Sequence, residues 1–234
     1  RQMCIRDRFW GNHDQTRAVS RFASDASQAL RVRSAKMLAA AMYLLRGTPF
    51  LYQGEEIGMT NFPFRDETQL RDVESLNLLA QARKDGREAW AWNGIRKKGR
   101  DNARTPMQWD ASANAGFTAG TPWIDVNPNY RQINVREAQA DPDSILHFYR
   151  RLLALRQGSD ALRSGTFRLL LPEHPQLLAY ERACGEERIR VCCNFSGAPA
   201  VLPSEIQGDC LLCDGVENGR MEPYGLCCVQ LLHH

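Results

Sequence analysis

The pattern of apolar and polar residues gives the first half of the chain a mixed α/β character. Residues 9–14 run from two aromatic residues into a polar stretch, which predicts the end of a buried strand followed by a loop. Residues 31–46 are rich in strong helix formers, with apolar residues at helical spacing, and Gly47 is a natural stop. A short apolar run at 48–53 predicts a second buried strand. Strand, loop, helix and strand together predict a βαβ unit with a parallel sheet.

The stretch from 54 to 141 is polar and interrupted by Gly, Pro and Asn, and only residues 68–83 carry a helical pattern within it. A long irregular stretch inside a domain is usually functional or disordered. Its many aromatic residues argue against disorder because they give the segment apolar surface to bury. A second long helix is predicted at 145–157, where apolar residues form one broad face.

After Gly165 the pattern changes to short apolar runs separated by turn residues. These runs predict an all-β module, a small antiparallel β-sandwich. They lie at 166–171, 177–181, 188–194, 200–202, 210–213 and 225–232. The fold class predicted for the whole chain is therefore α/β followed by all-β.

Composition narrows the function classes. The net charge is +3 and the basic residues form no long run, which argues against a nucleic-acid partner. No apolar stretch reaches the roughly 18–20 residues that a membrane span requires, and the first eight residues lack the apolar core of a signal peptide. We expect a cytoplasmic protein with no membrane partner.

Seven of the eight cysteines lie after position 183. Two adjacent pairs, at 192–193 and 227–228, sit in strand-like runs, where neighbours point to opposite faces and cannot chelate one ion together. Cys210 and Cys213 have the spacing of a zinc knuckle. We interpret the cysteines as reduced thiols that act as small hydrophobic residues, with a metal site and a disulfide as the alternatives. No metal and no cofactor are predicted.

Several long motifs follow one another in order along the chain. They are FWGNHDQTR at 9–17, GTPFLYQGEEIGMTN at 47–61, RDVESLN at 71–77, KGRDNARTPMQWD at 98–110, NAGF at 114–117 and PW at 122–123. This set resembles the α-glucosidases of the α-amylase superfamily, glycoside hydrolase family 13, the group that holds oligo-1,6-glucosidase and trehalose-6-phosphate hydrolase. The resemblance extends from about Phe9 to the C-terminus.

The resemblance implies the last two strands of a (β/α)8 barrel and then a small antiparallel β-sandwich. Asp14 would end the seventh barrel strand, and residues 50–53 would form the eighth. The domains expected are a catalytic barrel part at 9–163 and a C-terminal β-sandwich at 164–234. Residues 1–8 depart from the family and are interpreted as foreign sequence, and Gly11 stands where these enzymes carry a bulkier polar residue.

The implied chemistry is a retaining hydrolysis of α-glucosidic bonds, which needs a carboxylate nucleophile and a carboxylic acid close together. Asp14 resembles the third carboxylate of the family, the stabiliser of the transition state. His13, Arg100 and Glu74 resemble residues that bind the substrate. The implied partner is a small oligosaccharide or α-glucoside, bound by a monomer when full length.

Structural alternatives compete with these assignments. Arg100 and Arg104 could simply tie the long loop to the barrel through salt bridges. Glu55 and Glu56 are expected to be structural. The tryptophans of the long loop are expected to pack rather than to hold sugars.

The family places its nucleophile and acid after strands four and five, before the first residue of this chain. The chain is therefore interpreted as a C-terminal fragment, inactive by itself. Two other identities stay open for the longer protein of which this chain would be a fragment. They are a glucosyl-transferring or sucrose-isomerising relative, and a non-catalytic barrel like the heavy chain of amino-acid transporters. The linkage and the acceptor sugar are undetermined.

Overall fold

The computed structural model describes residues 7–231, and within them the chain forms two compact units. The first unit holds residues 7–10, 23–50 and 147–231, and the second holds residues 11–22 and 51–146. The interpretation of residues 1–8 as foreign sequence falls mostly outside the described residues. Among residues 7–231 there is no helix both long and apolar enough to serve as a membrane span.

The βαβ prediction is confirmed in the first unit. Strand β1 (Asp7–Arg8) pairs in parallel with β2 (Thr48–Pro49), and helix α2 lies between them in the sequence. The predicted bounds were wrong, because Phe9 and Phe50 follow the strands instead of extending them, and both are about half exposed. The backbone N–H of Phe50 still donates to the Arg8 carbonyl at 2.8 Å, after which pairing ends.

Helix α2 (Gln28–Tyr43) begins and ends three residues earlier than predicted. Its start is set by Ser27, whose hydroxyl accepts a hydrogen bond from the Leu30 N–H. Its last carbonyls are satisfied by Arg156 of α7 (Ile145–Gly158), which donates to the carbonyl oxygens of Tyr43, Leu45 and Gly47. Arg156, which is distant in sequence, therefore satisfies the C-terminal end of this helix. The sequence had predicted that Gly47 would end it.

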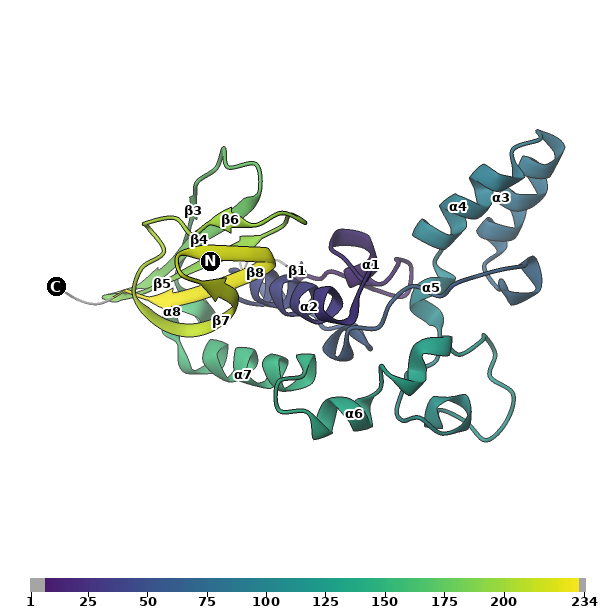
Figure 1. Cartoon of the computed structure of the whole chain (residues 1–234), viewed down its shortest axis with the longest axis horizontal. Helices are drawn as coiled ribbons and strands as arrows, with labels where there is room; N and C mark the ends of the chain where they lie inside the picture. The colour runs from purple at the N-terminus through teal and green to yellow at the C-terminus, as the bar shows by residue number, and fades with distance from the viewer. Residues whose placement is uncertain (1–6, 232–234) are drawn as a thin grey trace, which may run out of the picture. The chain divides into compact units, whose positions relative to one another are not determined.

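The all-β module is confirmed as one curled antiparallel sheet (Figure 1). The strand order is β3-β4-β5-β8-β6, and β7 also pairs with β8. The strands are β3 (Thr166–Leu170), β4 (Leu177–Cys184), β5 (Glu187–Asn194), β6 (Ala200–Val201), β7 (Asp209–Glu217) and β8 (Arg220–Gln230). The hairpin of β7 and β8 is longer than predicted, because its polar ends still pair although its apolar run is short. Helix α8 (Asp160–Ser164) precedes the sheet.

The two faces of this sheet bury different residues. One face meets α2: the Tyr180 hydroxyl donates to the carbonyls of Ala40 and Ala41, and Arg182 Nη1 donates to the Leu44 carbonyl at 2.8 Å. The other face forms an apolar core inside the curl. Its members include Leu177, Ala179, Cys192, Ile206, Met221, Cys227 and Val229.

The interpretation of the cysteines as packed thiols is confirmed for four residues and wrong for three, because Cys184, Cys210 and Cys213 are free but exposed. Both adjacent pairs are buried free thiols, and Cys192 faces the apolar core while Cys193 donates toward the Met37 carbonyl on the α2 face. Cys210 and Cys213 lie on β7, and their Sγ atoms are 2.6 Å apart. Among residues 7–231 no group of three His, Cys, Asp or Glu side chains is arranged to hold a metal ion.

The second unit contains more helix than predicted. Residues 68–83 resolve into a short 3-10 turn η2 (Glu67–Gln69) and helix α3 (Val73–Lys84), which Asp72 caps. Helix α4 (Glu88–Lys98) was missed, because it contains Gly94 and buries only a narrow apolar stripe. The remaining helical segments are α1 (Ala18–Phe22), η1 (Glu55–Ile57), α5 (Asp101–Arg104), η3 (Ala113–Gly116), η4 (Pro128–Arg131) and α6 (Val135–Ala140).

Helices α3 and α4 form a hairpin with its own core (Figure 1). The chain turns between them at Gly86, which has a left-handed φ of 65°. The residues buried there include Phe62, Phe64, Leu70, Leu79, Ala91 and Ile95. This hairpin holds the start of α3 and the end of α4 next to α5, where the candidate site residues lie.

Candidate active site

Asp14 lies in a tight loop that presents its carboxylate to solvent. The Asp14 N–H donates to Asn12 Oδ1 at 2.8 Å, so the loop folds around the asparagine side chain. His13 Nε2 lies 3.2 Å from Asp14 Oδ2. About half of the Asp14 side chain and most of the His13 side chain are exposed, which leaves both accessible to a ligand.

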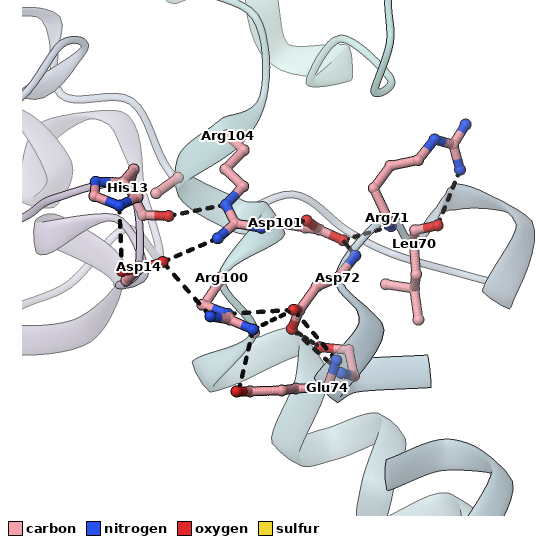
Figure 2. Close-up of polar contacts among 12 residues, drawn as sticks. His13, Asp14, Leu70, Arg71, Asp72, Glu74, Arg100, Asp101 and Arg104 are labelled. Carbon is pink, nitrogen blue, oxygen red and sulfur yellow. Dashed lines mark hydrogen bonds and ion pairs between the residues drawn. The ribbon is translucent and has the colours of Figure 1, made fainter. Parts of the chain in front are cut away.

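Arg100, the N-cap residue of α5, and Arg104, its last residue, hold this loop in place (Figure 2). Arg104 donates from Nε to the His13 carbonyl and from Nη2 to Asp14 Oδ1, both at 2.9 Å. Arg100 Nη1 lies 3.6 Å from the same Asp14 oxygen. The two arginines are four residues apart, which is the spacing that places side chains on one face of a helix.

Arg100 also joins the start of α3. Its Nη2 lies 2.7 Å from Asp72 Oδ1 and 3.2 Å from Glu74 Oε2. Burial alone would raise the pKa of Asp72, but hydrogen bonds from Arg100 and Ser75 outweigh it and hold that pKa below its usual value. Asp72 in turn raises the pKa of the Arg100 guanidinium. Asp72 is therefore a buried carboxylate that fixes the direction of Arg100.

Asp101 holds the backbone just before α3 in place. Its side chain is almost fully buried, and its Oδ2 accepts the backbone N–H groups of Arg71 at 2.7 Å and Asp72 at 2.8 Å. Three segments distant in sequence, at 13–14, 71–74 and 100–104, thus meet in one polar network (Figure 2).

The four residues that the sequence singled out, Asp14, His13, Arg100 and Glu74, are brought together by the structure. Arg104, which the sequence treated as a structural tie, contacts Asp14 at a shorter distance than Arg100 does. Sequence reasoning missed the contribution of Asp72. The available signal was its position directly before a helical pattern, which is where an N-capping Asp stands.

Buried Arg17 holds the backbone around the site. It donates from Nη1 to the Gln53 carbonyl at 2.7 Å, from Nε to the Asn102 carbonyl at 3.1 Å and from Nη2 to Thr105 Oγ1 at 3.1 Å. Burial lowers the pKa of Arg17 to about 10. A single guanidinium thus fixes the segment after β2 and both ends of α5.

Glu55 is a buried carboxyl group next to the Asp14 loop. Burial, and after it the charge of Glu56, raises the pKa of Glu55 to about 8. Neither oxygen has a partner at good hydrogen-bonding geometry among the described residues, and the backbone N–H groups of Tyr52 and Gly11 only partly offset the burial. A Cβ at Gly11 would lie 2.7 Å from Glu55 Oε1, so the glycine leaves room for this carboxyl.

The expectation that the loop tryptophans pack is wrong for Trp90, Trp109 and Trp123, which are all at least half exposed. Trp92 packs partly against the core of the α3–α4 hairpin. Aromatic content predicts that apolar surface exists, but it does not predict which ring is covered.

The chain belongs to the alpha-amylase family, because the family model described as "Alpha amylase, catalytic domain" matches residues 1–165. The oligo-1,6-glucosidase of Parageobacillus thermoglucosidasius is 50% identical over 202 residues, which cover 85% of this chain and 36% of the relative. The trehalose-6-phosphate hydrolase of Escherichia coli (strain K12) is 50% identical over 189 residues, which cover 80% of this chain and 34% of the relative.

Solved structures of the family agree with the fold. The trehalose-6-phosphate hydrolase of Bacillus licheniformis matches with a TM-score of 0.90 and 42% identity over 98% of this chain and 43% of its own. A trehalulose synthase matches with a TM-score of 0.89 and 36% identity over 97% of this chain and 43% of its own. The chain thus spans between 34% and 43% of the length of these relatives. It corresponds to the C-terminal part of their fold.

Proposed function

We propose that this chain is part of an α-glucosidase that hydrolyses α-glucosidic bonds in short oligosaccharides by a retaining mechanism. The observation that carries the proposal is the exposed Asp14 carboxylate, held by two arginines in a loop that the family motif predicts. Because the chain spans less than half of its relatives, the activity is assigned to the longer enzyme. The nucleophile and the general acid are expected outside this chain, which by itself is expected to be inactive.

Each residue of the site has a role in this proposal. Asp14 binds hydroxyls of the sugar ring at the cleaved bond and stabilises the positive charge that develops in the transition state. His13 and Arg100 bind the same ring, His13 through its ring nitrogens and Arg100 through its planar fork of donors. Glu74 binds the acceptor sugar from the start of α3.

Similarity favours a hydrolase over a sugar isomerase. The hydrolases named above are 42–50% identical to the chain, whereas the trehalulose synthase is 36% identical. We further propose that residues 9–163 belong to the catalytic barrel and 164–234 to the C-terminal β-domain, a boundary close to residue 165, where the family match ends. The full-length enzyme is proposed to be a cytoplasmic monomer.

A chimera tests the function. The corresponding C-terminal part of the Parageobacillus thermoglucosidasius oligo-1,6-glucosidase is replaced by this chain, and hydrolysis of a nitrophenyl α-glucoside is measured. We expect activity in the chimera, none in the chain alone, and a loss of about 10²–10³-fold or more in kcat for Asp14→Asn. Asp143→Asn, on an exposed carboxylate outside the network, is the control. Activity that survives Asp14→Asn would refute the proposal.

A further inference from the structure

A hollow with a volume of about 440 Å³ opens between α3 and α4, beside Arg100. Arg100, Asp72 and Glu74 line it, whereas Asp14 does not. Arg100 therefore stands between two neighbouring spaces, with Asp14 near its Nη1 and the hollow on the side of Asp72 and Glu74. The volume lies within the range of small-molecule sites in proteins.

The lining combines an apolar platform with a polar rim. Trp90 and Leu78 supply apolar surface, and both side chains are exposed. Asn93, Glu74 and Lys97 supply hydrogen-bonding groups around them. A sugar ring has the same division, since its faces carry C–H groups and its edge carries hydroxyls.

The Trp90 ring has one cation–π contact, which restrains it. The Arg87 guanidinium lies over it, with Cζ 4.4 Å from the ring centroid. The indole nevertheless remains 55% exposed, so part of its surface is open to a ligand. A restrained and partly exposed aromatic ring loses little conformational entropy when a ligand stacks on it.

Gly94 lines the hollow and adds no side chain to it. It lies inside α4, where glycine destabilises a helix by about 1 kcal/mol relative to alanine. No backbone strain requires it, and a Cβ built there meets no described atom within 4 Å. A residue that is unfavourable for the helix and unnecessary for packing therefore lies at the wall of the hollow.

A phosphate group fits this hollow less well. The start of α3 could attract an anion, but the Asp72 carboxylate already accepts the N–H groups of Glu74 and Ser75 there. The Asp72 and Glu74 carboxylates also line the space and oppose a second negative charge. Lys97 and Lys98 are the cations of the lining that have no ion pair among the described residues, and both lie on the exposed end of α4.

We propose that the hollow between α3 and α4 is a further saccharide subsite, which binds the neutral glucosyl unit next beyond the acceptor sugar of an α-glucan. This rests on the proposed function, because the order of the sugars follows from Asp14 binding the cleaved ring and Glu74 the acceptor. The third ring stacks on Trp90, and its hydroxyls bind Asn93 and Lys97. The chain accordingly favours trisaccharides over disaccharides.

Binding to the full chain tests the proposal. The five tryptophan indole N–H signals are followed by ¹⁵N NMR during titration with isomaltotriose, isomaltose and glucose 6-phosphate. We expect isomaltotriose to shift the Trp90 signal and to bind about five-fold or more tightly than isomaltose. Trp90→Ala should remove this difference, while Trp123→Ala, on an exposed ring outside the hollow, should keep it.

Gly94→Leu separates binding from folding. Leucine fills the hollow and favours the helix, so we expect weaker isomaltotriose binding in a protein at least as stable as the original. Gly158→Leu, at a second helical glycine with open space around it, should leave binding unchanged. Binding that is absent, or unaffected by Trp90→Ala and Gly94→Leu, overturns the subsite. Tighter binding of glucose 6-phosphate than of isomaltotriose also overturns the subsite. The chimera reports on Asp14 separately, so either proposal can fail while the other stands.

Discussion

Arg100 Nη2 lies 2.7 Å from Asp72 Oδ1, and this buried carboxylate is also the N-cap of α3. One side chain therefore starts a helix and directs the arginine that reaches Asp14. The start of α3 therefore helps to position the Arg100 guanidinium, although Arg100 itself belongs to the start of α5.

This double role predicts separable effects at Asp72. Asp72→Ala removes both the cap and the ion pair and should lower the free energy of unfolding by about 1 kcal/mol or more, whereas Asp72→Asn keeps a capping oxygen and should lower it less. Because the folded pKa of Asp72 is depressed, its contribution is present above the unfolded pKa of about 3.9 and is lost as the pH falls through the folded pKa. Urea denaturation from pH 3 to 7 measures this, with Asp143→Asn as control. An equal loss at every pH would contradict it.

Glu55 predicts a pH dependence of the opposite sign. Its pKa is raised to about 8, so the folded state holds a proton that the unfolded state releases near pH 4.3. Stability should therefore fall as the pH rises from about 5 to 8, by at most about 1.4 kcal/mol per pH unit. Glu55→Gln should remove this slope, while the exposed Glu173→Gln should retain it. Tryptophan fluorescence during urea denaturation reports on this unit, which contains four of the five tryptophans. Parallel slopes in all three proteins would count against a neutral Glu55.

Arg17 should not tolerate replacement by lysine. A lysine keeps the charge but cannot reach three separate backbone and hydroxyl acceptors with one planar fork. We expect Arg17→Lys to destabilise the protein by about 2–3 kcal/mol, because buried acceptors lose their donors. Arg21→Lys, on the exposed side of α1, is the matched control and should change stability little. Similar denaturation midpoints for the two variants would refute this role.

Arg182 predicts a comparable effect in the first unit. It is fully buried and donates to the carbonyls of Leu44, Thr166 and Gly165. Burial lowers its pKa to about 10. Arg182→Met should cost about 2–4 kcal/mol by leaving these carbonyls without a donor, and Arg188→Met, on an exposed arginine of β5, should cost much less. Thermal unfolding followed by far-ultraviolet circular dichroism measures both.

The sequence predicted the elements whose pattern is local. Helix α2 was found from its alanine and leucine content, and the strands of the curled sheet were found from short apolar runs. The errors occur where contacts with distant residues determine the local structure. The end of α2 depends on Arg156, and α4 has too few buried residues to give a periodic signal.

The same distinction applies to the candidate site. Motif order was enough to select Asp14, His13, Arg100 and Glu74, which the structure brings together. The hydrogen bonds that Asp72 and Asp101 make could not be predicted, because they depend on the approach of α5 to the start of α3. The exposure of Trp90 required the α3–α4 hairpin to be known.

Strand β8 is preceded in the chain by every other strand of the curled sheet, yet it pairs with three of them, β5, β6 and β7. During synthesis β6 and β7, which pair with no other described strand, must therefore wait for this partner, with the apolar surface of the curl partly uncovered. A chain that ended before β8 would lack the centre of the sheet and not merely an edge. Helix α2, made long before, would lose its contacts with β8. The sheet of this unit can thus be completed only after β8 has been synthesised.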